Sequence, residues 1–305
     1  MKGRRAKDCR QDAGTEVSRV GHERVTLMDS PLPVEPHGDA AVRQRARAEA
    51  RASFARVGAR TEPARLFETG GLRWRFPRSS SPCEAAIVNT GGGVAGGDSY
   101  SVSLTLSEGA EVEATTPSAE RIYRSNGPAA SIATRLTLAP RARLFWLPQE
   151  TLIFEGALLE RRLELDTSDE AAFIVVETLV FGRLAMGESR IDATLRDSWR
   201  VRRDGRLVFA DETRLEHAGA TLERKAVGAG ARALSTIVAS APDIEARLPD
   251  LRAALDAAGS DMESGASAFD RLIVVRLLAA SSDRLRAALI ASIVALGGRK
   301  PRLWP

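Results

Sequence analysis

The chain has 305 residues, enough for one large domain or two small ones, and its 44% hydrophobic residues can build a substantial core. Its net charge of +4 is concentrated in residues 1–60, while the remainder is close to neutral, which argues against a nucleic-acid binder with a basic folded surface. The two cysteines, the lack of an apolar signal region and the lack of any apolar run near ~18 residues predict a cytoplasmic protein without membrane contact.

The N-terminal segment differs from the rest of the chain. Residues 1–42 are charged, contain three prolines and show no sustained periodicity, so we expect a flexible basic leader. We expect residues 43–305 to form a single domain, with a β-rich body over 43–230 and a mixed α/β part over 231–305. Residues 43–51 fit either one or two helical turns or a first strand.

Most of the expected body consists of strands and turns. After short strands at 72–76 and 85–89, strand–turn–strand units follow one another. The expected units cover residues 100–116, 131–147, 158–178 and 194–210. The turns of the first three recur about every 30 residues. This pattern predicts a mainly β fold of stacked antiparallel hairpins, either a flattened β-sandwich or a β-helix-like pile.

A glycine-rich stretch, NTGGGVAGGD at residues 89–98, precedes the first unit. Gly91, Gly93 and Gly96 satisfy the dinucleotide pattern G-x-G-x-x-G, but that fingerprint requires a helix after the glycines. Residues 100–106 instead alternate polar and apolar side chains, as a half-buried strand does. We therefore expect a turn between two strands.

The C-terminal part changes period. We expect a strand at 234–240, a helix at 243–258 that Pro249 kinks or divides, and a strand at 269–280. A second helix is expected at 282–296, capped by Ser282 or Asp283 and closed by Gly297. The fold therefore ends in an α/β element that carries two helices.

Catalytic and metal-binding patterns are weak. The three histidines and two cysteines are scattered, so we expect no stable metal site. His217 is the only histidine in the expected body, and no G-x-S-x-G motif accompanies it. We therefore expect no catalytic residues and no enzyme activity.

Carboxylates at strand ends are more informative. Glu150, Glu177 and Glu188 each lie where an expected strand passes into a loop. Glu177 is surrounded by apolar residues, where a carboxylate needs a partner, and Arg183 is a candidate. A structural ion pair and a functional acid both fit this pattern.

Several segments, in order along the chain, resemble the UreD family of urease accessory proteins. The matching segments are residues 89–98, 115–119, 122–125 (IYRS), 147–156 (LPQETLIFEG), 179–188 (LVFGRLAMGE), 202–208 and 274–278. The ending PRLW at 301–304 is also similar, whereas Glu120 and Arg121 depart from the family's small residue followed by Lys or Arg.

The resemblance implies a scaffold without catalysis that binds apo-urease together with UreF-like and UreG-like (GTPase) partners. Nickel in transit would be its cargo, without a stably bound cofactor, and would pass through an internal passage. The candidate passage residues are Asp98, Glu150, Glu177 and Glu188. The candidate partner-binding or structural residues are Gly92, Gly93, Gly96, Gly97, Tyr123, Arg124 and Arg183.

Another class of protein stays open on the residues alone. A β-rich ligand- or carbohydrate-binding protein, or an enzyme, would use the loop over 91–97 as a ligand cradle. A nucleotide-binding enzyme is disfavoured by the strand after the glycines.

Overall fold

The computed structural model describes residues 45–77, 82–183, 187–188, 191–259 and 261–305. Contacts group Gln44–Pro305 into one unit. The leader expected over 1–42 lies outside the described residues.

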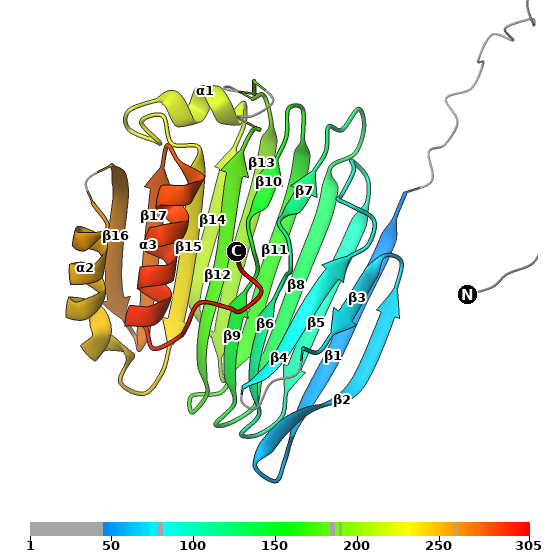
Figure 1. Cartoon of the computed structure of the whole chain (residues 1–305), viewed down its shortest axis with the longest axis vertical. Coiled ribbons are helices and arrows are strands. Elements are labelled where there is room, and N and C mark those ends of the chain that lie inside the picture. The colour runs from blue at the N-terminus through cyan, green and yellow to red at the C-terminus, as the bar shows by residue number, and fades with distance from the viewer. Residues whose placement is uncertain (1–44, 78–81, 184–186, 189–190, 260) are drawn as a thin grey trace, which may run out of the picture. The chain divides into compact units, whose positions relative to one another are not determined.

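Two β-sheets form the described part of the chain (Figure 1). Sheet A consists, in spatial order, of β14 (Arg206–Leu215), β13 (Thr194–Arg203), β11 (Leu158–Thr167), β8 (Ala130–Leu138), β5 (Ser99–Leu106), β1 (Arg47–Val57) and β2 (Arg60–Thr69). Sheet B runs through β16 (Met262–Phe269), β17 (Leu272–Ala279), β15 (Ala233–Ser240), β12 (Ala172–Phe181), β9 (Arg143–Leu147), β6 (Glu111–Thr115), β4 (Cys83–Asn89) and β3 (Leu72–Arg75). Two short strands, β7 (Glu120–Ile122) and β10 (Thr151–Ile153), pair beside β12.

The two strands of each of the first three units lie in opposite sheets. β5, β8 and β11 pair in parallel in sheet A, while β6, β9 and β12 pair in parallel in sheet B. The 30-residue repeat is therefore one coil of a β-helix-like pile, which confirms the mainly β, stacked fold. The antiparallel pairing expected inside these units does not occur, because each strand pairs with the matching strand of the next coil. The fourth unit is a true hairpin, with Asp204 and Gly205 at positive φ in its turn.

Alternation of side chains explains why the sheets pack face to face. Along β11, every second residue is buried, so one face points into the space between the sheets and the other points outward. β12 is buried on both faces. One face of β12 joins the core between the sheets, and the other joins a second core beneath the helices. The order of layers is sheet A, sheet B and helices.

The C-terminal element carries the two expected long helices on sheet B (Figure 1). The expected helix at 243–258 consists of a short 3₁₀ helix, η2 (Ile244–Arg247), followed by α2 (Leu248–Ala257) with Pro249 in its first turn. α3 (Ser282–Ala295) begins where expected, but its cap is Ser281 and not Ser282 or Asp283, because the Ser281 hydroxyl accepts a hydrogen bond from the Arg284 amide. The short helix α1 (Ala218–Glu223) and the strand β16 were not expected. Among the described helices, none combines the length and apolar character needed to cross a bilayer.

Candidate functional site

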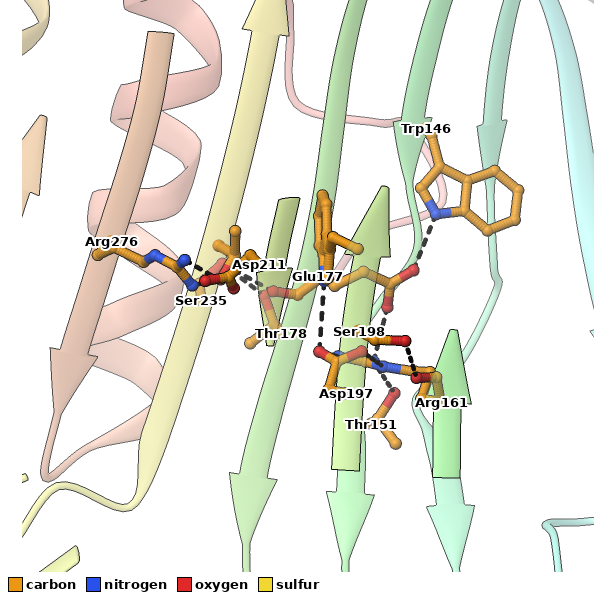
Figure 2. Close-up of polar contacts among 12 residues, drawn as sticks. Trp146, Thr151, Arg161, Glu177, Thr178, Asp197, Ser198, Asp211, Ser235 and Arg276 are labelled. Carbon is orange, nitrogen blue, oxygen red and sulfur yellow. Dashed lines mark hydrogen bonds and ion pairs between the residues drawn. The ribbon is translucent and has the colours of Figure 1, made fainter. Parts of the chain in front are cut away.

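A cluster of charged side chains lies in the core between the two sheets. The inward faces of β11, β12 and β13 each contribute one residue, namely Arg161, Glu177 and Asp197. Figure 2 shows the three side chains pointing toward one another, with Trp146 and Thr151 beside them. We call Arg161, Glu177 and Asp197 the interior cluster.

Each charged side chain of the interior cluster has hydrogen-bond partners. Arg161 donates from Nε and Nη2 to the two oxygens of Asp197, at 3.0 and 2.7 Å, in a bidentate pair. Its Nη1 donates to Glu177 Oε2 at 2.7 Å and to the Thr151 hydroxyl at 3.2 Å. The Trp146 indole donates to the other oxygen of Glu177 at 3.0 Å. Because all three charged side chains are buried, removing Arg161 would leave two buried carboxylates without a cation.

The cluster contains two carboxyl groups and one guanidinium. Burial raises the pKa of Glu177, and the Arg161 charge and the Trp146 hydrogen bond oppose that shift without cancelling it. Burial also opposes the charge on Arg161, but the two carboxylates outweigh it and raise the pKa of the guanidinium. Of the two carboxylates, Asp197 forms the bidentate pair with Arg161, and Glu177 accepts a single hydrogen bond from it.

A cavity of about 190 Å³ lies beside the interior cluster. Both sheets and the glycine turn contribute to its walls, which combine apolar and polar side chains. Its lining includes Leu72, Ile87, Asn89, Gly92, Gly93, Tyr100, Val102, Thr116, Ser118, Ala119, Glu120, Arg121, Ile132, Thr134, Trp146, Pro148, Gln149, Thr151, Arg161 and Glu177. The exposed members of this set, Gly92, Ser118 and Arg121, mark its outer end, whereas Arg161 and Glu177 mark its inner end.

The glycine turn at the outer end joins β4 of sheet B to β5 of sheet A, as expected. Gly93 has a φ of 143°, and a Cβ there would overlap the Tyr123 ring. A Cβ on Gly96 would overlap Ser125. The glycines therefore allow the turn to pack against the Tyr-Arg-Ser segment at 123–125.

The remaining candidate glycines have positive φ, with values of 76° for Gly92 and 83° for Gly97. Gly92 accepts a hydrogen bond at its carbonyl from the Tyr123 hydroxyl, at 3.0 Å. Asn89 at the start of the turn donates to both carboxylate oxygens of Glu120, at 3.1 and 3.0 Å. Burial raises the pKa of Glu120, and the Asn89 hydrogen bond opposes this shift.

Tyr123, Arg124 and Arg183 come together at the surface around Phe154. The Tyr123 and Phe154 rings meet edge to face at 5.5 Å, and the Arg183 guanidinium lies 4.3 Å from the Phe154 ring centre. Arg124 lies 3.9 Å from Glu155. We call these three residues, all of which the sequence singled out, the rim.

The four candidate passage carboxylates are not brought into one channel in this structure. Glu177 lines the cavity. Asp98 accepts hydrogen bonds from the backbone amides of Ala46 and Ala95, each at 2.8 Å, and so fixes the chain around the turn.

Glu150 and Glu188 each pair with an arginine away from the interior cluster. Glu150 receives two hydrogen bonds from Arg286 of α3, at 2.8 and 2.6 Å. Glu188 pairs with Arg183, which lowers the pKa of Glu188. The expected pair between Glu177 and Arg183 is wrong, because β12 points Glu177 inward to Arg161, whereas Arg183 follows the strand at the surface.

A second buried charge cluster lies on the outer face of sheet B. Residues 297–305, which we call the C-terminal strap, follow α3 and place Arg299 Nε 2.9 Å from the buried Glu113 carboxylate. Glu84, next to Glu113 in the register, lies 3.5 Å from Arg299. Burial raises the pKa of Glu113 despite the hydrogen bond from Arg299.

The end of the C-terminal strap is fixed by Trp304. Its indole N–H reaches the Thr115 hydroxyl at 3.1 Å and the Leu147 carbonyl at 3.2 Å, and the side chain is buried. The C-terminal strap therefore connects the C-terminal element to β6 and β9 of sheet B.

Sequence reasoning missed Arg161 and Asp197. Both occupy apolar positions of an alternating strand: Arg161 lies between Leu159 and Leu163, and Asp197 lies between Leu195 and Trp199. A charged residue at an inward position requires a buried partner, so this pattern was the available signal. Within the described residues, no three His, Cys, Asp or Glu side chains gather where they would hold a metal ion.

Comparison with known proteins identifies the family. Residues 46–305 match the family described as UreD urease accessory protein. The urease accessory protein UreD of Beijerinckia indica subsp. indica is 47% identical over 261 residues, covering 85% of this chain and 97% of that protein. The urease accessory protein UreD of Methylobacterium sp. (strain 4-46) is 46% identical over 254 residues, covering 81% and 90%. The chain belongs to the UreD family of urease accessory proteins.

Proposed function

We propose that this chain is an assembly scaffold that binds apo-urease together with UreF-like and UreG-like partners and assists nickel insertion, without catalysis of its own. Membership of a family whose members are named urease accessory proteins supports this role. The compartment we propose is the cytoplasm. The two-sheet pile, closed by helices and the C-terminal strap, provides a rigid body for such a scaffold.

Nickel, as cargo, would move through the cavity between the sheets. The observation that carries this proposal is the position of Glu177, a buried carboxylate at the inner end of a cavity that begins at the glycine turn. Carboxylate oxygens bind divalent ions without the strength of a thiolate or multi-histidine site, so an ion held there can leave again. Arg161 offsets part of the negative charge and would keep such binding weak.

The rim is the surface that we propose for partner contact. Tyr123 and Arg124 are exposed, and Arg183 stacks on Phe154 beside them. Exposed aromatic and arginine side chains supply much of the free energy of protein association. The remaining candidate carboxylates, Asp98, Glu150 and Glu188, have local hydrogen-bond partners, and a role in nickel transit would require these contacts to open.

Reconstitution tests the proposed function. Apo-urease, the UreF-like and UreG-like partners, GTP and nickel would be combined with and without this chain, and urease activity and bound nickel would be measured. We expect activation only when the chain is present. Full activation in its absence would overturn the scaffold role.

One observation favours a second candidate function. The glycine turn borders a cavity of about 190 Å³ with apolar and polar walls, which suits a small ligand such as a sugar. Calorimetric titration with a panel of mono- and disaccharides would show saturable binding if the chain acted in this way, and Gly93→Ala would abolish that binding.

A further inference from the structure

The outer face of sheet A carries a continuous set of polar side chains. Parallel pairing aligns residues of β5, β8, β11 and β13 in rows across the sheet. The long helices α2 and α3 cover sheet B instead (Figure 1). Among the described residues, neither long helix covers this face of sheet A, so a partner can reach it.

A groove of about 390 Å³ crosses this face over β8, β11 and β13. The register places Arg162 between Ala133 and Ser198, two small residues that leave space on either side of it. Four outward-facing arginines line the groove: Arg162, Arg196, Arg200 and Arg202. We call it the arginine groove.

The arginines of the groove differ in their partners. Arg196 pairs with Glu212 at 3.1 Å, and Arg200 donates to the Trp199 carbonyl at 2.7 Å. In contrast, Arg162 and Arg202 have neither an ion pair nor a hydrogen bond among the described residues, although Asp166 is next to Arg202 in the register.

Two of the three acidic residues that line the groove already have a partner. Glu164 pairs with Arg135, which is outside the lining, at 3.1 Å, and Glu212 pairs with Arg196 of the groove. The Arg162 and Arg202 guanidinium groups thus stay available for a ligand while Glu164 and Glu212 are already engaged. An anionic ligand would accept charge-assisted hydrogen bonds from these two guanidinium groups.

We infer that the arginine groove binds an acidic, extended segment of a partner protein. Arg162 lies opposite Ser198, and Arg202 is four residues further along β13, a separation of about 13 Å along the strand direction. Carboxylates four residues apart in an extended peptide are separated by the same distance. A nucleic-acid backbone fits less well, because its unbroken phosphates would meet Glu160, Glu164 and Glu212 in the lining.

This docking surface goes beyond the proposed function and does not depend on nickel. It faces away from the layer of helices, and it requires neither the cavity nor the rim. Electrostatic complementarity of this kind gives an interaction that weakens with salt.

The test uses a fluorescent peptide of about twelve residues in which glutamate and threonine alternate, so that its carboxylates repeat at the strand interval. Binding to the full chain would be followed by anisotropy at low and at high salt. We expect saturable binding that salt weakens and that the double variant Arg162→Glu/Arg202→Glu weakens about tenfold or more. The matched control is Arg47→Glu/Arg65→Glu, which makes the same charge change on β1 and β2 and should leave affinity nearly unchanged.

Three results would overturn the inference. They are no binding of the acidic peptide to the wild-type chain, equal weakening by both double variants, and binding of a thymidine oligonucleotide at least as tight as that of the peptide. Circular dichroism checks the fold of each variant, and Arg162→Gln replaces the double variant if that one misfolds. The assay contains neither urease nor nickel, so its failure would leave the proposed function standing.

Discussion

The interior cluster and the charges under the C-terminal strap use the same chemistry in two different settings. Each places arginine against two carboxylates, with Arg302 joining Arg299 under the strap, and burial raises the pKa of one glutamate in each. In the interior cluster, Arg161 and Asp197 come from adjacent strands of sheet A and Glu177 comes from sheet B, and the Arg161 side chain is 4% exposed. Under the strap, Arg299 comes from the end of the chain and is 48% exposed.

The charges under the strap stabilise the fold, whereas those of the interior cluster border a cavity. The strap ties residues 186 positions apart, so its ion pair closes the fold. The interior cluster differs: its Arg161–Asp197 pair joins strands that already share a ladder in sheet A, and its Arg161–Glu177 pair links the two sheets. Its charge lies instead at the inner end of a cavity, which is why we assign function there.

The largest effect is expected from Arg161→Met. This variant leaves Glu177 and Asp197 buried without a cation, which should lower the free energy of unfolding by about 3–5 kcal/mol. Urea denaturation measures the change. Arg162→Met, one position away on the outer face of the same strand, is the control and should stay within about 0.5 kcal/mol. Similar losses in the two variants would contradict the contrast between faces.

Arg299→Met should have a smaller effect. Glu113 loses its hydrogen-bonded cation, but Arg302 stays beside the neighbouring Glu84 and the carboxyl group can take up a proton, so we expect a loss of about 1–3 kcal/mol. Denaturation curves would be compared with those of Lys300→Met, a strap residue whose side chain donates a hydrogen bond to the Pro305 carbonyl. A loss as large as that of Arg161→Met would make the two clusters equivalent.

The pH dependence of stability sharpens the comparison further. A carboxyl group whose pKa is raised by folding contributes stability below its unfolded pKa of about 4.3 and loses that contribution as pH rises through the raised value. For Glu177 and for Glu113, wild-type stability should therefore fall relative to the matching Gln variant as pH rises above that point. Parallel curves of stability against pH for wild type and variant between pH 4 and 8 would show that folding does not raise the pKa of that glutamate.

The smallest effect is expected at the exposed pair of Arg135 and Glu164. Both side chains reach solvent, and the pair should contribute no more than about 0.5–1 kcal/mol. A double-mutant cycle with Arg135→Met and Glu164→Gln measures this coupling. A coupling comparable to the loss from Arg161→Met would show that burial does not decide the difference.

Much of the fold was predictable from the sequence because alternation and turn spacing reflect local rules. The coil repeat and the helix divided at Pro249 followed from such patterns. β2 and β16 were not predicted: β2 is exposed along nearly its whole length, and β16 is exposed at most of its positions. Both are strands because a neighbouring strand pairs with their backbone, which no local pattern records.

The candidate site was predicted only in part. The sequence identified Glu177 as a buried acid, but assigned it to Arg183, the nearest arginine in the same segment. The true partner, Arg161, is on the opposite sheet, and its contact depends on how the two sheets pack. The closeness of the glycine turn to Tyr123 likewise depends on a coil return that sequence spacing does not reveal.

We propose that Glu177 binds nickel in transit, whereas Glu113 stabilises the fold. The direct measurement is the nickel content of urease after reconstitution with the Glu177→Gln or the Glu113→Gln chain, at matched partner binding. We expect Glu177→Gln to lower the nickel bound per urease strongly and Glu113→Gln to leave it near the wild-type level. Equal nickel content with the two variants would contradict the assignment of Glu177 to the nickel route.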